Sequence, residues 1–267
     1  MEKFENLFVV YDPTRQEQPA LERAADMARR TSVKVHVFTC IYSDTAKADE
    51  VKSLIAEYQG ILEAVVAPLR EQGIAVSTEV EWDKNWYQAA VRASIKSSAD
   101  LVLKPSYKHS PGQRLLNKTS DWTLIRECLC PVLLVKEDSS RCTPRVLAAI
   151  DICAKNESYE RLNQNVINFG KQIIDNRGAE VHYINAFQDF RGVPNRQELI
   201  RNTGIESDKI HIKLGDPDKI IIEHAKKLDV SLVVVGNSAR SGLSAAFLGN
   251  TVEKVLDKVE CDVLSMP

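Results

Sequence analysis

The sequence has few aromatic residues and no long apolar run. Aromatic residues make up 6% of the 267 residues, and no stretch approaches the roughly 20 apolar residues that a membrane-spanning helix needs. The first five residues are largely charged and polar and lead directly into a strand-like segment. We therefore expect no signal peptide, no membrane partner and a cytoplasmic location.

An excess of one charge is also lacking. The chain carries 35 Lys and Arg against 37 Asp and Glu, so its formal net charge is −2. Proteins that coat nucleic acids need a clustered excess of basic residues to displace counterions from the phosphates. The sequence therefore predicts no nucleic-acid partner. With 44% hydrophobic and 27% charged residues, its composition is that of a folded globular protein.

Metal-binding and redox motifs are missing. The six cysteines form no Cys-x-x-Cys pair, and Cys128 and Cys130 are one residue apart, which is too close for a zinc knuckle. The five histidines show no His-x3-His spacing. We expect reduced, mostly buried thiols and no metal site.

Catalytic signatures are missing as well. The sequence contains no Gly-x-Gly-x-x-Gly, no Walker loop, no Gly-x-Ser-x-Gly and no His-Glu-x-x-His. Serines, histidines and aspartates occur, but nothing orders them into a triad. We expect no catalytic residue and no enzyme, with weak ATP hydrolysis or autophosphorylation left open. A rival hypothesis is an enzyme that uses Asp12 and Asp151 as acid and base.

What the sequence does contain is an internal repeat. Three apolar segments of the first half recur in the second half, in the same order and at a nearly constant offset: 8–12 with 147–151, 99–104 with 230–235, and 129–134 with 260–265. Shared order and offset argue for two copies of one domain. We assign them to residues 1–138 and 145–267, joined by a polar, proline-containing linker at 137–144.

Each copy alternates strands with helices. In the first copy we predict strands at 7–11, 33–42, 75–81, 100–104 and 132–136, and helices at 19–30, 49–72, 86–97 and 120–128. In the second we predict strands at 146–151, 180–186, 209–214, 231–236 and 262–266, and helices at 159–177, 196–202, 217–228 and 249–259. The strands are rich in Val, Leu and Ile without polar alternation, which is typical of strands buried on both faces. The pattern predicts an α/β fold with a parallel sheet and helices on both faces.

Ligands of open α/β sheets bind beyond the carboxyl ends of the strands. In the second copy Asp151 ends the first strand, a loop from Gly236 to Gly242 follows the fourth, and Gly249-Asn250-Thr251 comes at the expected start of the last helix. Free amides and the positive end of the helix dipole would make that point an anion site, with phosphate the obvious anion. The alternative is that the glycines and polar residues only end a strand and cap a helix.

The segments 235–243 and 248–256 resemble the signature of the universal stress protein family: glycine, two residues, glycine, nine residues, glycine, then Ser or Thr. The resemblance extends over the whole chain, as two family domains in tandem. The segments 10–13, 18–21 and 245–251 look like those of the tandem, E-type members in proteobacteria. The resemblance implies a five-stranded sheet of order 3-2-1-4-5 in each domain, a role in the stress response, and binding of ATP or ADP, with Mg2+ as a companion ion. It also implies that the two domains form an intramolecular pseudo-dimer, and it allows a homodimer.

Carried over residue by residue, the resemblance implies one nucleotide site in the second copy. Its members are Ala149, Ile150 and Asp151 at the adenine, Ala186 in the base pocket, and Val235, Gly236, Ser238, Arg240, Gly249, Asn250 and Thr251 around the ribose and phosphates. Two positions depart from the family pattern, because Ala239 replaces the second glycine and Asn250 replaces Ser or Thr.

The first copy departs further from the signature. Pro105 stands where the second copy has Gly236, and Lys118 stands where it has Gly249. Proline has no N–H group, so a backbone phosphate cradle is not available there. Lys104, Lys108 and Lys118 could still attract an anion, but we favour a degenerate domain kept for packing. The alternative function for the whole chain is a scaffold, or a protein that binds a ligand other than a nucleotide.

Overall fold

The computed structural model describes residues 4–107, 114–136, 144–153, 156–237 and 245–267. By its internal contacts the chain divides into two compact units. The N-terminal unit spans Glu2–Glu137 and the C-terminal unit spans Asp138–Pro267, together with Met1.

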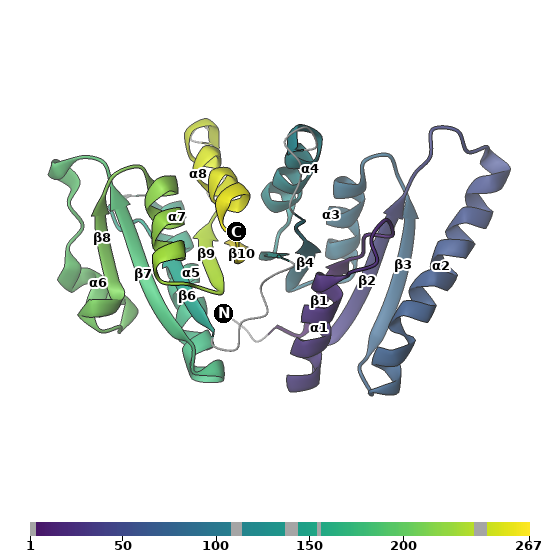
Figure 1. Ribbon diagram of the computed structural model, residues 1–267, viewed down its shortest axis with the longest axis horizontal. Helices are drawn as coiled ribbons and strands as arrows, with labels where there is room; N and C mark the ends of the chain where they lie inside the picture. Colours follow the sequence, from purple (N-terminus) through teal and green to yellow (C-terminus); the bar gives the residue numbers. More distant parts are fainter. Residues whose placement is uncertain (1–3, 108–113, 137–143, 154–155, 238–244) are drawn as a thin grey trace. The chain divides into compact units, whose positions relative to one another are not determined.

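The N-terminal unit is a five-stranded parallel sheet of order β3-β2-β1-β4-β5 (Figure 1). Its elements are β1 (Asn6–Val10), α1 (Pro19–Arg30), β2 (Lys34–Ile41), α2 (Ala48–Glu71), β3 (Val76–Trp82), α3 (Trp86–Lys96), β4 (Leu101–Pro105), α4 (Arg114–Glu127) and β5 (Val132–Val135). This order is the one expected from the family resemblance.

The C-terminal unit repeats this topology with the parallel order β8-β7-β6-β9-β10. Its elements are β6 (Arg145–Ala149), α5 (Glu157–Arg177), β7 (Glu180–Phe187), η1 (Phe190–Gly192), α6 (Arg196–Thr203), η2 (Ser207–Lys209), β8 (Ile210–Leu214), α7 (Pro217–Lys227), β9 (Leu232–Gly236), α8 (Ala245–Lys258) and β10 (Asp262–Met266). The predicted α/β class is therefore confirmed for both units.

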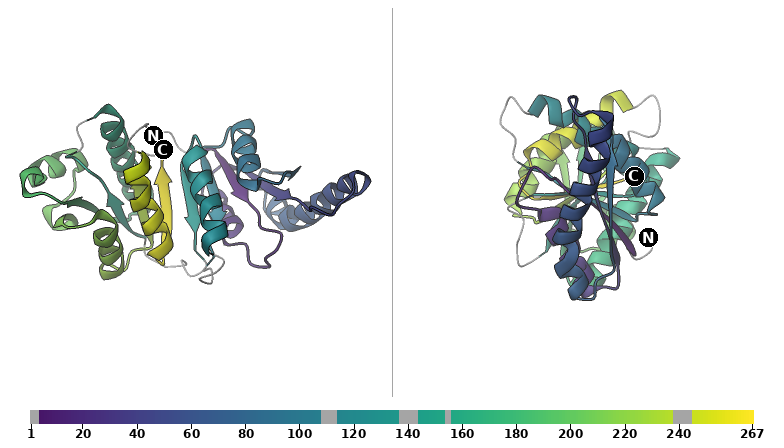
Figure 2. Two further views of the ribbon diagram at one scale, coloured as in Figure 1. Left: turned by 90° about the horizontal axis from the view of Figure 1, so that it is seen from above. Right: turned by 90° about the vertical axis from the view of Figure 1, so that its right-hand side faces the viewer.

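Helices lie on both sides of each set of strands, as Figure 2 shows from above. In the N-terminal unit α1 packs on β1 and β4, whereas α3 packs on β2 and against α4; in the C-terminal unit α5 packs on β6 and β9, and α7 packs against α8. The central strands are consequently buried on both faces, and Phe8, Val9, Leu147 and Ala148 are fully buried. This explains why these strands show no polar alternation.

Strand pairing shows which positions correspond in the two units. Leu7 pairs with Leu101 in the first unit as Val146 pairs with Leu232 in the second. The turn after the third helix is also repeated, because Ser98 and Asp229 both adopt a left-handed backbone, with φ of 53° and 50°. Equivalent positions can therefore be compared between the units.

Two predicted helix boundaries are wrong. The last helix was expected to begin at Gly249, but α8 begins at Ala245, and α4 begins at Arg114 instead of residue 120. Residues 245–248 are Ala, Ala, Phe and Leu, which are compatible with a helix and carry α8 one turn further. A glycine inside a helix costs only about 1 kcal/mol, so Gly249 does not stop it. The short helix expected at 196–202 is present as α6.

Candidate functional site

The carboxyl end of β6 leads into a tight turn that Asp151 organises. Oδ1 of Asp151 accepts a hydrogen bond of 3.0 Å from the amide of Cys153, two residues further on. This side-chain-to-backbone bond is an Asx turn. The other oxygen, Oδ2, has no hydrogen-bond partner among the described residues, and the Asp151 side chain is exposed. One carboxylate oxygen therefore holds the turn and the other is available to a ligand.

Two asparagines hold the backbone of this turn. Asn163 on α5 bonds Asp151 twice: its Oδ1 accepts from the Asp151 amide at 2.9 Å, and its Nδ2 donates to the Asp151 carbonyl at 2.6 Å. Asn185 on β7, which is 1% exposed, accepts from the amide of Ile152 at 3.1 Å. The direction of the chain after β6 is thus determined by side chains from a helix and from the neighbouring strand.

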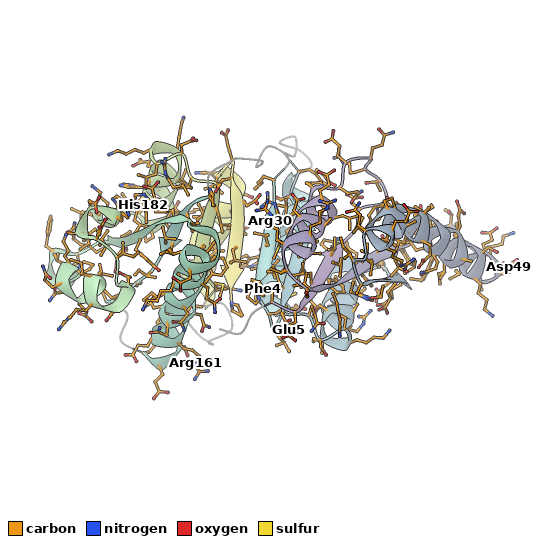
Figure 3. All side chains as sticks on the ribbon, turned by 90° about the horizontal axis from the view of Figure 1, so that it is seen from below. Phe4, Glu5, Arg30, Asp49, Arg161 and His182 are labelled. Atoms are coloured by element: carbon orange, nitrogen blue, oxygen red, sulfur yellow. The ribbon has the colours of Figure 1, made fainter. Side chains whose placement is uncertain are left out.

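Gly236, at the end of β9, lies directly beneath Leu162 of α5. A β-carbon at residue 236 would overlap Cγ and Cδ2 of Leu162. Arg161, the preceding residue, is exposed and projects away from α5 (Figure 3), so this turn of the helix presents Leu162 to the strand. Packing alone therefore requires glycine at position 236.

The amides expected to hold phosphate are less available than the sequence predicts. The amide after Gly236, that of Asn237, donates to the carbonyl of Met266 at 2.7 Å. Gly249 is the fifth residue of α8, and only the first turn of a helix has free amides. By helix geometry, the amides of α8 that lack an intrahelical acceptor are therefore those of Ala245–Phe247, and Gly249 is not among them.

The remaining members of the expected site lie as follows. Ala149 is the last residue of β6 and is half-buried, and Ile150, which follows it, is buried. Ala186 is half-buried near the end of β7. Val235 is buried in β9. Asn250 and Thr251 lie within α8. Ser238, Ala239 and Arg240 lie outside the described residues. Asp151 follows the carboxyl end of β6, and Ala186 lies near the carboxyl end of the adjacent strand β7.

The N-terminal unit builds the same turn at Asp12. Oδ1 of Asp12 accepts from the Thr14 amide at 2.9 Å, and the Gln18 side chain accepts from the Asp12 amide at 3.2 Å and donates to its carbonyl at 2.6 Å. Gln18 thus does for Asp12 what Asn163 does for Asp151. In both units the strand-end aspartate shapes a turn. Among the described residues, no second acid or base group is hydrogen-bonded to either aspartate side chain.

The strand ends of the N-terminal unit differ at the position of Gly236. Pro105 ends β4, and Tyr107, which is buried, donates to the carbonyl of Glu17 at 3.0 Å. Lys104, one of the lysines expected to attract an anion, pairs with Asp121 at 3.0 Å. The side chains of Lys108 and Lys118 lie outside the described residues. The described part of this crevice is filled by the protein's own side chains.

A second polar cluster lies on the sheet of the C-terminal unit, where sequence spacing gave no signal. His182 on β7 (labelled in Figure 3), His211 on β8 and His224 on α7 gather there. Nδ1 of His182 is 3.1 Å from Nε2 of His211, and the ring centroids of His211 and His224 are 5.6 Å apart. Burial, with the neighbouring His182 and His224, lowers the pKa of His211 to about 4. His211 is therefore neutral near pH 7.

The described residues contain no group of three or more His, Cys, Asp or Glu side chains placed to hold a metal ion. Nor does any helix in the described part of the chain have the length and apolar character needed to cross a membrane.

The family model described as "Universal stress protein family" matches residues 3–136 and 174–267. The universal stress protein E of Salmonella typhi is 28% identical over 99% of this chain and 94% of its own length, and that of Escherichia coli K12 is 27% identical over the same shares.

Solved structures agree with these matches. A protein of unknown function from Pseudomonas aeruginosa is 28% identical, with a TM-score of 0.78 over 98% of this chain and 92% of its own. A universal stress protein from Archaeoglobus fulgidus is 18% identical, with a TM-score of 0.75 over 98% of this chain and 95% of its own. At that identity the second likeness concerns the fold alone.

Proposed function

The chain belongs to the universal stress protein family, and on that basis we propose that it is a regulatory protein of the stress response whose C-terminal unit binds ATP or ADP. In this proposal the protein acts through binding and not through turnover. Mg2+ would enter with the nucleotide phosphates. A cytoplasmic location, pairing of the two units as a pseudo-dimer and formation of a homodimer remain predictions of the same proposal.

The difference between the two strand ends supports the C-terminal unit as the proposed nucleotide site. In the C-terminal unit β9 ends at Gly236. In the N-terminal unit the equivalent strand, β4, ends at Pro105, and the buried Tyr107 lies two residues further on. Proline offers no amide, and Tyr107 fills the space beside it. A phosphate cradle built from backbone amides is therefore not available at this strand end of the N-terminal unit, which leaves the C-terminal unit as the proposed site.

The residues present fit a nucleotide in part. The free Oδ2 of Asp151 can accept a hydrogen bond from the exocyclic amine of adenine. The first turn of α8, with its free amides at Ala245–Phe247, is the described feature best suited to phosphate oxygens. This assignment replaces the amides of Gly249, Asn250 and Thr251 as the expected phosphate donors, and those residues stay in the proposed site as neighbours on α8.

The proposal is tested with the full chain. Mild heating of the purified protein should release ATP or ADP, detected by chromatography. ATP or ADP should also raise the melting temperature of nucleotide-free protein, and EDTA should reduce the effect if Mg2+ takes part. At about 100 times the dissociation constant the gain should be about 2.7 kcal/mol. If no nucleotide is released and neither nucleotide shifts the melting temperature, the alternative applies, namely a scaffold or a protein that binds another ligand.

A further inference from the structure

The N-terminal unit contains a pocket of about 280 Å³ at the opposite end of its sheet from Asp12. The amino-terminal parts of β1, β2 and β3 form its floor, and the end of α3 forms its wall. Its lining includes Leu7, Lys34, His36, Ser77, Glu79 and Lys96. The volume suits a small metabolite and is too small for a nucleotide with its phosphates.

Four polar side chains of this pocket form a connected network. His36 on β2 lies between two residues of β3, with its Nδ1 2.8 Å from Oγ of Ser77 and its Nε2 3.2 Å from Oε2 of Glu79. The other oxygen of Glu79 accepts from Nζ of Lys96 at 2.7 Å. The charge of Glu79 is thus compensated by Lys96, and Ser77 keeps a hydroxyl at the pocket surface.

A second ammonium group in the pocket is not compensated. Among the described residues the side chain of Lys34 has no hydrogen-bond or ion-pair partner. The nearby carboxylate of Asp100 accepts from the amides of Glu5 and Asn6, both at 2.8 Å, and does not line the pocket. With Glu79 and Lys96 paired, Lys34 leaves the pocket with one net positive charge.

The equivalent place in the C-terminal unit is filled. Strand register makes His36 equivalent to His182, since they pair with Phe8 and Leu147 respectively, and makes Glu79 equivalent to His211. Helix α7 adds His224 over His211, whereas α3 has Ala93 at that position. The first unit therefore has the carboxylate of Glu79 where the second has the imidazole of His211, and it has no counterpart of His224.

We propose that this pocket binds a small organic carboxylate with a short apolar body. The ammonium of Lys34 pairs with the ligand carboxylate, and the apolar part lies against Leu7 and Val35. With one net positive charge, the pocket neutralises a monoanion and leaves a phosphate dianion only partly compensated. The site lies in the N-terminal unit and does not depend on nucleotide binding in the C-terminal unit.

Butyrate is a suitable probe, and butylammonium, butanol and inorganic phosphate are its controls. In two-dimensional NMR spectra of the 15N-labelled full chain, butyrate should produce saturable shifts at the amides of Val35, Ser97 and Ala99. Butylammonium and butanol should not, and inorganic phosphate should bind more weakly than butyrate.

Exposed lysines supply the variants, because their replacement leaves the fold intact. Lys34→Gln should weaken butyrate binding about tenfold, the loss expected for one charge-assisted contact. Lys96→Gln should weaken it as well, because Glu79 is then uncompensated. Lys52→Gln, an exposed lysine on α2, is the matched control and should bind like the unmodified protein. The proposal is overturned if butyrate gives no saturable shift, if Lys34→Gln binds it unchanged, or if butanol or butylammonium shifts the same amides equally.

Discussion

Leu162 covers the α-carbon of Gly236 so closely that no side chain fits between them. The contact joins α5 to the end of β9, next to the turn that Asp151 and Asn163 hold together. A glycine that belongs to a family signature for ligand binding is therefore also a packing residue. The packing role can be measured by substitution.

Replacing Gly236 by Ala should lower the free energy of unfolding by about 1–3 kcal/mol, the usual cost of overpacking a core. The variant Leu162→Ala should remove the overlap, so the double variant should be more stable than the two single effects predict. Urea denaturation of the four proteins measures this coupling. Gly60→Ala, at an exposed site of α2 with no atom within 4 Å of the new carbon, should instead stabilise by about 0.5–1 kcal/mol. Simple additivity of the two single variants would contradict the contact.

Asp151→Asn should weaken adenine-nucleotide binding without unfolding the turn. Asparagine keeps an oxygen that can accept from the Cys153 amide, but it replaces the free Oδ2 by a donor, which repels the amine of adenine. Titration calorimetry with ATP measures the effect, and a loss of about tenfold corresponds to 1.4 kcal/mol. Asp12→Asn makes the same change in the N-terminal unit and should leave ATP binding as it is. Equal effects of the two variants would argue against a site at Asp151.

Asn163→Ala should destabilise the C-terminal unit by about 0.5–1.5 kcal/mol, because the exposed backbone amide and carbonyl of Asp151 exchange their bonds to Asn163 for bonds to water. Gln18→Ala removes the corresponding bonds of Asp12 in the N-terminal unit and should cost a similar amount there. Hydrogen exchange followed residue by residue should locate each loss in its own unit. A loss of protection that spreads equally through both units would contradict this assignment.

The stability of the C-terminal unit should fall as the pH drops from about 6.5 towards 4. The pKa of His211 is lowered to about 4 by burial and by the adjacent imidazoles, from an ordinary value of 6.5. The unfolded chain therefore binds more protons than the folded one in this interval, and protonation favours unfolding. Lys213 and Arg196 add to the effect by lowering the pKa of His211 further.

Urea midpoints measured across this interval test the expectation. His211→Gln should show a shallower fall than the unmodified protein, whereas Lys226→Gln, an exposed change on α7, should fall as steeply. The bonds of Glu180 to Arg145 and His182 lower the pKa of its carboxylate. Carboxylates of this kind contribute to the loss of stability mainly at the acid end of the pH interval. If His211→Gln leaves the slope unchanged, the cluster does not control the acid response.

Much of the fold can be predicted from the sequence. Apolar runs such as 147–150 are buried on both faces wherever they lie in a parallel sheet, so their type follows from composition. The repeat of the strand-end aspartates, Asp12 and Asp151, marked the two copies. The start of α8 was missed because glycine is a weak local signal, and the neighbouring residues outweigh it.

The candidate site was less predictable. Asp151 and Ala186 were placed at adjacent strand ends because parallel strands bring their carboxyl ends to one edge. No periodicity pointed to Asn163 as the residue that holds the Asp151 backbone, or to Leu162 as the reason for Gly236. Each depends on how α5 is rotated on the sheet, and a helical pattern gives its apolar face but not its partners.

The sequence by itself determined two α/β copies, the strand-end aspartates and the loss of the glycine motif in the first copy, because these follow from local composition and order. Only the tertiary structure decided that three histidines meet in one unit while an open pocket lies at the same place in the other. Strand register and helix packing bring together residues far apart in the chain, so neither the contacts of the histidines nor the lining of the pocket follows from the local sequence.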